Sequence, residues 1–399
     1  MRTSACHVRM VCALATGLLM AIGGTALAPR AASGPVDPDP RIVSADAVHS
    51  PVVALDAASS TSRVRYSSTS VRGRPTEMTG TVLLPRSSPP RGGWPLAVWN
   101  HMTVGAADSC APSTGHANHP ERPRMTSGDL IVGHLLDAGF AVVRPDFEGI
   151  GGPGPHPYLI GGSLARSAID LAVAASRDDA RIGRDVVVAG HSEGAVAALF
   201  AASRPDTEWH GLRVRAVAAL APPTQVARML DAASGVPVAG PAINELMGLA
   251  ALLGYGAAAA DPGFEQLMLH GGGLSPAARR LVPHVEQRCY AGLTQFDSYG
   301  GLAPAQLLGP QGARLKAGLL AILDRNDVAH LRFSPGLPVR IETGTVDTVS
   351  PQPFVSDLVR SYRRAGVQVT YNERVIGHAG VAAEPGGAKE VARWLIGQA

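Results

Sequence analysis

The sequence predicts a protein of the α/β class, with a mostly parallel β-sheet flanked by helices and a large helical insertion. Three observations support this expectation. Strand-like and helix-like segments alternate between residues 95 and 222, which is typical of a parallel sheet covered on both faces. Residues 224–335 contain helices and loops but no convincing strand, and two further strands follow them. With 399 residues, of which 46% are hydrophobic, the chain can bury a large core.

The first part of the predicted core spans residues 48–222. Hydrophobic runs bounded by Gly, Pro and Ser indicate its strands, and helical spacing of apolar residues indicates its helices. Residues 101–127 show no period, and a loop of this length is usually functional or disordered. Residues 29–47, rich in Pro, Ala and Asp, are expected to form a loose leader. The expected strands are 63–67, 79–84, 95–100, 140–144, a run starting at 186, and 214–220; the expected helices are 129–138, 164–176 and one after residue 192.

The helical insertion is expected to span residues 223–336 and to form a cap over the sheet. Ser275 followed by Pro276 is typical of a helix start, and Leu315, Leu319 and Ile322 share one helical face. The second part of the core, residues 337–399, is expected to contain strands at 339–342 and 367–372 and helices at 353–365 and 388–396. No segment after the N-terminal apolar run is expected to be long enough to cross a membrane.

The most informative motif is Gly190-His191-Ser192-Glu193-Gly194. The motif alone is weak evidence, because a chain with 46 glycines can contain it by chance. Here a Val-rich run precedes it and an Ala-rich run follows it, which is the strand–turn–helix context of a nucleophile elbow. A Cβ at either glycine would crowd the turn or the helix that packs on it. Ser192 is therefore the candidate nucleophile.

A serine hydroxyl needs a base to take its proton and a carboxylate to orient that base. In enzymes with a nucleophile elbow, the acid and then the histidine follow the serine, each after a later strand of the sheet. Asp347 follows the strand predicted at 339–342, and His378 follows the strand predicted at 367–372. We therefore predict a catalytic triad of Ser192, His378 and Asp347. Asp146 is the alternative acid, but it precedes the nucleophile and a structural role is expected for it.

The negative oxygen of a tetrahedral intermediate needs hydrogen-bond donors that are already in place. We expect one donor to be the backbone N–H of Glu193, whose side chain the chemistry does not require. The second donor is expected near Thr103, within residues 102–105, in the loop that follows the strand at 95–100. Among the other histidines, His101 and His156 lie in loops near the expected site, and His191 is expected to pack or bond locally.

The N-terminus predicts a secretory signal peptide over residues 1–28. It has two arginines, an apolar run from Met10 to Ile22, and the small-residue pattern Ala26-Leu27-Ala28. Cleavage after Ala28 would leave Pro29 first, so cleavage after Ala26 is an alternative, and an uncleaved membrane anchor is another. Removing the two arginines from a formal charge of +3 leaves about +1, so the charge does not indicate nucleic-acid binding.

Two of the four cysteines lie in the predicted signal peptide, which leaves Cys110 and Cys289. Two cysteines in an exported protein most simply form one disulfide bond. A metal site of Cys110, His116 and His119 is the alternative, although one cysteine with two nearby histidines is weak evidence for it. We therefore expect a disulfide bond, and neither a metal nor a cofactor.

These motifs resemble those of the secretory lipases, a family of the α/β-hydrolase superfamily that includes the fungal A-type lipase and bacterial relatives. The resemblance covers residues 50–399. It implies an α/β-hydrolase fold with a helical cap, catalytic roles for Ser192, Asp347 and His378, and a disulfide at Cys110, for which Cys289 is the remaining partner. The chain departs from the family at Met102, where relatives often have Gly, and at Glu193, where many have Gln. Besides the elbow and the two later triad residues, the resemblance rests on Asn100-His101-Met102-Thr103-Val104-Gly105, Cys110-Ala111-Pro112-Ser113, Pro145-Asp146-Phe147-Glu148-Gly149 and Pro153-Gly154-Pro155-His156-Pro157-Tyr158-Leu159.

The sequence thus predicts a secreted, monomeric serine lipase or esterase that hydrolyses carboxylic esters, acylglycerols in particular, through an acyl-enzyme. Ester or lipid small molecules are its expected partners, with transient contact at lipid interfaces and no nucleic acid. Residues Leu246–Ala260 are uncharged and can either line an acyl-chain tunnel or form a core helix of the cap. Two alternatives use the same fold. One is an acyltransferase or polyester-degrading esterase with the same triad, and the other is a catalytically silent binding protein, against which the ordered triad argues.

Overall fold

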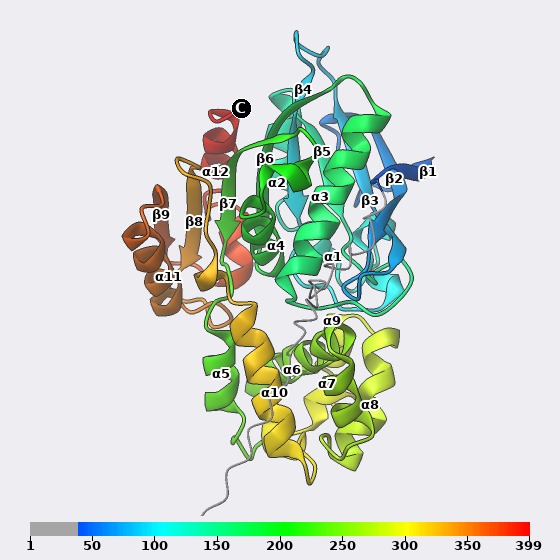
Figure 1. The fold of residues 1–399 in the computed structure, drawn as a ribbon, viewed down its shortest axis with the longest axis vertical. Helices are drawn as coiled ribbons and strands as arrows, with labels where there is room; N and C mark the ends of the chain where they lie inside the picture. The colour runs from blue at the N-terminus through cyan, green and yellow to red at the C-terminus, as the bar shows by residue number, and fades with distance from the viewer. Residues whose placement is uncertain (1–38) are drawn as a thin grey trace, which may run out of the picture. The chain divides into compact units, whose positions relative to one another are not determined.

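A computed structural model describes residues 39–399, so the predicted signal peptide lies outside the described residues. The described chain folds into a nine-stranded sheet with helices on both faces and a group of helices inserted between β7 and β8 (Figure 1). The strand order is β1-β2-β3-β5-β4-β6-β7-β8-β9. The pairs β1–β2, β2–β3 and β3–β5 are antiparallel and all the others are parallel. The predicted fold class is therefore confirmed.

The elements follow the expected order closely. The strands are β1 (Ile42–Ala47), β2 (Ala58–Thr69), β3 (Pro75–Pro85), β4 (Trp94–Asn100), β5 (Ala141–Pro145), β6 (Ile182–His191), β7 (Arg213–Leu220), β8 (Val339–Gly344) and β9 (Val369–Arg374). The helices are α1 (Arg122–Met125), α2 (Asp129–Asp137), α3 (Gly161–Asp178), α4 (Glu193–Ala202), α5 (Val226–Ala233), α6 (Pro241–Ala260), α7 (Pro262–Leu269), α8 (Pro276–Gln287), α9 (Tyr290–Leu293), α10 (Gly312–Arg325), α11 (Gln352–Arg364) and α12 (Ala388–Ile396).

The central strands are buried on both faces, because successive side chains of a strand point to opposite sides of the sheet. Val186 and Val188 of β6 belong to the core that also contains residues of α3, α4 and α11. Val187 and Ala189 belong to the opposite core, with residues of α2 and α12. Two apolar faces of this kind explain why β6 is a continuous hydrophobic run and not an alternating pattern.

The segment before residue 48 differs from the expected loose leader. Residues Ile42–Ala47 form β1, which pairs with β2 at the edge of the sheet. Only Ile42 is partly buried and the other five residues are exposed, so the sequence carries no hydrophobic pattern that would indicate a strand. Backbone pairing with β2 therefore holds β1, and the sheet begins at residue 42.

The segment between β7 and β8 contains α5 to α10 and no strand among the residues described. Its helices gather at one end of the sheet, in the lower part of Figure 1. Helix α8 begins as expected, because the Ser275 hydroxyl accepts a hydrogen bond from the N–H of Ala278. The two ends of the insertion meet at Asp327, whose carboxylate accepts the Thr224 hydroxyl at 2.7 Å and the Gln225 N–H at 2.5 Å.

Helix α6 corrects the expectation that no later segment could cross a membrane. Its residues 243–260 are long and apolar enough to do so by length and composition. More than half of this window is buried inside the protein, and Met247, Ala251 and Leu252 pack into the main core. Contact with several neighbouring helices explains why α6 is apolar over most of its length.

Candidate active site

Ser192 lies on the sharp turn between β6 and α4. Its backbone φ of 58° and ψ of −116° are outside the regions that most residues adopt, which is the strained conformation of a nucleophile elbow. A Cβ at Gly190 would lie 2.1 Å from the carbonyl oxygen of Gly194, and a Cβ at Gly194 would lie 2.1 Å from that of Asn100. Both positions therefore require glycine, as the motif predicts.

The structure brings the three predicted triad side chains together. His378 Nε2 lies 2.8 Å from Ser192 Oγ, and His378 Nδ1 lies 2.7 Å from Asp347 Oδ2. The other carboxylate oxygen of Asp347 accepts the N–H groups of Val349 and Ser350, each at 2.8 Å. The Asp347 side chain is fully buried and that of His378 is 12% exposed, so the ring is oriented from a buried side and reachable from the other.

Strand order explains this meeting of residues that are far apart in the sequence. Ser192 follows β6, Asp347 lies three residues beyond β8, and His378 lies four residues beyond β9. These strands are parallel, so their carboxyl ends share one edge of the sheet, which is where open α/β sheets place their sites. The helical insertion begins after β7 at the same edge.

The two expected oxyanion donors lie at the start of α4 and in the loop after β4. The N–H of Glu193 is at the first position of α4, where a helix provides no internal acceptor. Thr103 lies in the loop after β4 and is buried, with its hydroxyl 2.9 Å from the Tyr158 hydroxyl. Burial, reinforced by the nearby Glu193, raises the pKa of Tyr158 well above its ordinary value, so Tyr158 remains a neutral phenol.

The side chain of Glu193 has a partner that the sequence did not reveal. Its carboxylate lies 2.8 Å from His156 Nε2, while His156 Nδ1 lies 2.8 Å from the carbonyl oxygen of Glu148. Both side chains are fully buried. The Pro-Gly-Pro-His-Pro-Tyr segment placed His156 near the site, but no pattern indicated a bond across 37 residues to the residue after the nucleophile.

The alternative acid, Asp146, bonds to groups other than His378. Its carboxylate accepts the Thr79 hydroxyl at 2.7 Å and the N–H of Ser113 at 2.9 Å, which joins β3 to the loop of residues 101–127. His101 is buried beside it, with Nδ1 2.7 Å from the carbonyl oxygen of Met102, and burial lowers the pKa of His101. These two residues hold the loop in place.

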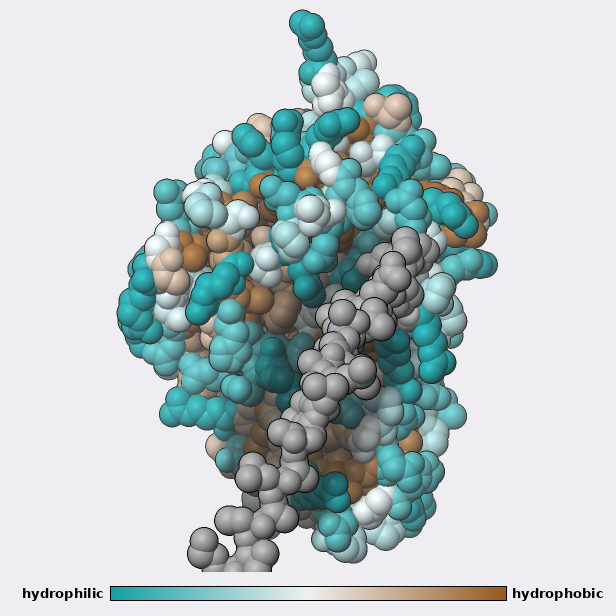
Figure 2. Space-filling view, viewed as in Figure 1, coloured by the Kyte–Doolittle hydropathy of each residue, from teal (hydrophilic) through white to brown (hydrophobic). Residues whose placement is uncertain are grey.

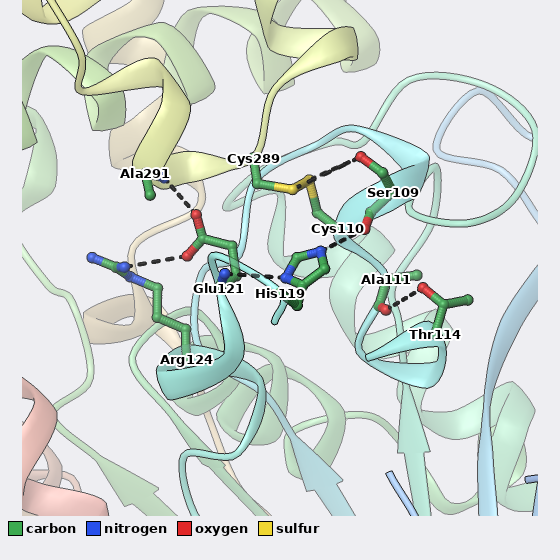
Figure 3. The surroundings of a disulfide bond; sticks show 9 residues. All are labelled: Ser109, Cys110, Ala111, Thr114, His119, Glu121, Arg124, Cys289 and Ala291. Carbon is green, nitrogen blue, oxygen red and sulfur yellow. Dashed lines mark hydrogen bonds and ion pairs between the residues drawn. A yellow bond between two sulfur atoms is a disulfide. The ribbon is translucent and has the colours of Figure 1, made fainter. Parts of the chain in front are cut away.

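The loop of residues 101–127 is also fastened to the insertion. Cys110 and Cys289 form the expected disulfide bond, with Cα atoms 5.5 Å apart (Figure 3). Gly105 forms a β-bridge with Cys289, and the carbonyl oxygen of Val104 accepts the Tyr290 N–H at 2.9 Å. The residue beside the expected oxyanion donor is therefore bonded directly to the insertion.

The alternative metal site at Cys110 is wrong, because the sulfur of Cys110 is bonded to that of Cys289. His119 Nε2 lies 2.9 Å from the carbonyl oxygen of Ser109, and its Nδ1 accepts the N–H of Glu121. Figure 3 shows the His119 ring between these two groups, beside the disulfide. Within residues 39–399 no group of three or more His, Cys, Asp or Glu side chains could hold a metal ion.

An apolar cavity lies inside the helical insertion. The volume of this cavity is about 90 Å³. Its lining comes from the insertion alone and includes none of the predicted triad residues. Figure 2 shows hydrophobic residues, coloured brown, at the surface in the lower part of the view, where the insertion lies. The lining includes Leu230, Ala250, Gly254, Phe264, Val282 and Leu319.

Comparisons with known proteins identify the fold and the family. The structure resembles Candida antarctica lipase A in its closed state, with a TM-score of 0.68 and 18% identity over 85% of this chain and 77% of that one. It also resembles the rice cell wall degrading esterase LipA from Xanthomonas oryzae, with a TM-score of 0.65 and 18% identity over 89% of this chain and 96% of that one. At these identities the likeness establishes the fold alone. No curated protein matches the sequence. The model of the secretory lipase family matches residues 124–398, which is more than half of the chain, so the protein belongs to the secretory lipase family and is a carboxylic ester hydrolase.

Proposed function

We propose that the protein hydrolyses carboxylic esters, acylglycerols in particular, through an acyl-enzyme formed on Ser192. The observation that carries this proposal is the pair of short hydrogen bonds from Asp347 to His378 and from His378 to Ser192. A carboxylate can only accept, so Nδ1 of His378 carries the ring proton and Nε2 is free to take the proton of the serine.

In the first half-reaction, Ser192 Oγ bonds to the ester carbonyl carbon and its proton passes to His378 Nε2. The carbonyl oxygen becomes negative and is stabilised by the N–H of Glu193 and by the second donor near Thr103. The bond to the alcohol oxygen then breaks, and the alcohol leaves with the proton from His378. The acyl group remains on Ser192.

In the second half-reaction, His378 takes a proton from water and the water oxygen bonds to the acyl carbonyl carbon. The bond to Ser192 then breaks, the proton returns to Ser192 Oγ, and a carboxylic acid is released. Asp347 orients the ring throughout and stabilises its positive charge without taking its proton. Each step balances without a metal or a cofactor.

The apolar cavity of the insertion supports a fatty acyl chain as the acid portion of the substrate. Its lining is mostly hydrophobic, and Ala250 and Gly254 contribute to it from residues 246–260 of helix α6, which are uncharged. Burial of an acyl chain contributes roughly 0.8 kcal/mol per CH₂ group. This supports the acyl-tunnel interpretation of residues 246–260.

Replacing Ser192 by alanine tests the proposal. We expect Ser192→Ala to lower kcat for p-nitrophenyl butyrate by at least about 10³-fold and to abolish labelling by a fluorophosphonate probe. Ser203→Ala is the matched control, because the hydroxyl of Ser203 bonds to the Phe200 carbonyl oxygen, at the far end of α4 from Ser192. Full activity in Ser192→Ala would refute the assignment, and more transfer to an added alcohol than to water would assign an acyltransferase.

We also propose that the protein is exported and acts as a monomer. The signal-like residues 1–28 and the Cys110–Cys289 disulfide support export, since disulfide bonds persist in oxidising compartments. N-terminal sequencing of exported protein should begin at Pro29 or Leu27, and a chain that still begins at Met1 in the membrane fraction would contradict the proposal. Size-exclusion chromatography with light scattering tests the monomer.

Transient contact with a lipid interface is supported by two exposed side chains. Val346, 59% exposed, immediately precedes Asp347, and Val375, 84% exposed, lies three residues before His378. Two exposed valines beside the triad place hydrophobic surface where an insoluble substrate must approach. Replacing both by serine should lower the rate on emulsified tributyrin and leave the rate on a dissolved ester unchanged. A variant that hydrolyses emulsified tributyrin as fast as the wild type does would contradict the proposed contact.

A further inference from the structure

His191, which directly precedes the nucleophile, takes no part in the reaction proposed above, yet it is fully buried against the base. Its Nε2 lies 3.0 Å from the backbone carbonyl oxygen of His378. Its Nδ1 lies 2.8 Å from Ser127 Oγ, and its ring centroid is 5.1 Å from that of His378. A single side chain therefore joins the end of the nucleophile strand to the backbone of the base.

These partners determine where the proton of the His191 ring lies. A backbone carbonyl oxygen can only accept a hydrogen bond. His191 Nε2 therefore carries the ring proton and donates a hydrogen bond to the carbonyl oxygen of His378. Nδ1 then has a free lone pair, which accepts the Ser127 hydroxyl. Burial, and next the charge of His378, lower the pKa of His191 to about 3. His191 therefore stays neutral when His378 becomes positively charged.

The backbone of His378 needs this support because it lies beyond the sheet. Strand β9 ends at Arg374, and Val375 in the following connection is 84% exposed. The backbone hydrogen bonds from Ile376 to Arg374 and from Gly380 to Gly377 lie within this segment, and the bond from the Val346 N–H to the Ile376 oxygen is long, at 3.4 Å. The shorter bond from His191 ties His378 itself to β6, the strand that ends at His191, directly before Ser192.

Ser127 is in turn fixed by the neighbouring strand β4. The next residue, Gly128, has φ of 90° and lies flat against Trp99, where a Cβ would stand 1.9 Å from the indole ring. Trp99 is 1% exposed and belongs to β4. The hydroxyl that orients His191 is therefore anchored in the core, not on a free loop.

We propose that His191 is a positioning residue for the base. Its N–H holds the backbone of His378 at the distance from Ser192 that proton transfer needs, and Ser127 keeps the ring in the tautomer that can donate. This inference rests on the proposed triad. It predicts that loss of the donor affects the chemical step and not the binding of substrate, because the His191 ring faces the backbone of the base.

Three variants separate a positioning role from simple packing. His191→Phe keeps a buried ring but has no donor, and we expect kcat for p-nitrophenyl butyrate to fall about 10- to 100-fold with KM within about twofold of the wild type. His191→Gln can place an amide N–H near the position of Nε2 and should recover most of this loss. Ser127→Ala should lower kcat several-fold at unchanged KM. His284→Phe is the matched control, because His284 also bonds to a serine hydroxyl, that of Ser298, but within the insertion.

Several outcomes would overturn the inference. His191→Phe with the wild-type kcat would do so, and so would equal losses in His191→Phe and His191→Gln, since the donor would then be irrelevant. If circular dichroism shows that His191→Phe does not fold, Ser127→Ala decides, and an unchanged kcat in that variant refutes the role. Activity that survives in Ser192→Ala refutes the proposed function itself, whereas loss in Ser192→Ala with full activity in His191→Phe refutes only the positioning role.

Discussion

Replacing Cys110 and Cys289 together by serine should lower the free energy of unfolding by about 5 kcal/mol. The disulfide bond joins residues that are 179 apart in the sequence. Closing a loop of that length restricts the unfolded chain, and the chain-entropy relation gives a contribution of about 5 kcal/mol at 25 °C. Both cysteines are buried, so the serine hydroxyls that replace the sulfurs also lose water.

The folded site should change much less than the stability. The hydrogen bond from Tyr290 to Val104 and that from the Ala291 N–H to the Glu121 carboxylate, at 2.5 Å, cross the same junction and remain in the variant. We therefore expect kcat of the folded double variant to stay within about threefold of the wild type, because the disulfide acts mainly on the unfolded chain. The loop carrying Thr103 would keep its place.

Urea unfolding followed by tryptophan fluorescence, together with kcat at 25 °C in the absence of urea, measures both quantities. The wild type treated with a thiol reductant provides the matched control, since it loses the covalent bond without a change of sequence. A loss of less than about 1 kcal/mol would refute the entropy argument. A loss of kcat of about 100-fold in a folded variant would show instead that the disulfide itself sets the geometry of the site.

Three further predictions concern the site, the cavity and pH. Glu193→Gln keeps a hydrogen-bond partner for His156 and should leave the free energy of unfolding nearly unchanged. Glu193→Leu leaves a buried ring nitrogen of His156 unpaired and should lower the free energy of unfolding, measured in urea, by about 1–3 kcal/mol. Equal losses in the two variants would contradict this prediction. Gly254→Leu should fill the cavity, since a Cβ at Gly254 meets only Met268 Sδ, at 3.7 Å. This variant should lower kcat/KM for dodecanoyl esters but not for acetyl esters. The control Gly133→Leu on α2, where nothing lies within 4 Å of the added Cβ, should leave kcat/KM for both esters unchanged. Burial and the facing His378 lower the pKa of His191 from 6.5 to about 3. Between these two pH values the unfolded chain binds a proton that the folded chain does not. The contribution of His191 to the free energy of unfolding is therefore complete above pH 6.5 and decreases as the pH falls. Between pH 7.5 and pH 5 the free energy of unfolding of the wild type should therefore fall by about 2 kcal/mol more than that of His191→Phe. Equal losses in the two proteins would refute the assignment of His191 as a neutral buried ring.

Local sequence was sufficient for much of the fold and for the choice of the proposed triad residues. The elbow is encoded in consecutive residues, because only glycine fits at Gly190 and Gly194, where a Cβ would lie 2.1 Å from a backbone oxygen. Asp347 and His378 could be selected because each follows a hydrophobic strand, and parallel strands end at a common edge. The Cys110–Cys289 bond followed from there being two cysteines outside the predicted signal peptide.

Other features had no local signal. Five of the six residues of β1 are exposed, so the strand carries no hydrophobic pattern, and pairing with β2 makes it a strand. Helix α6 is apolar because other helices surround it. Its own sequence does not specify whether protein or membrane surrounds an apolar helix of this length.

Composition, hydrophobic periodicity and glycine placement therefore predicted the α/β class, the helical insertion and the proposed triad residues. Tertiary structure alone decided which polar groups meet around them. His191 bonds to a residue 187 positions away, and Glu193 bonds to one 37 positions away. Hydrogen bonds form between atoms about 3 Å apart, and separation along the chain says nothing about that distance until the sheet has closed.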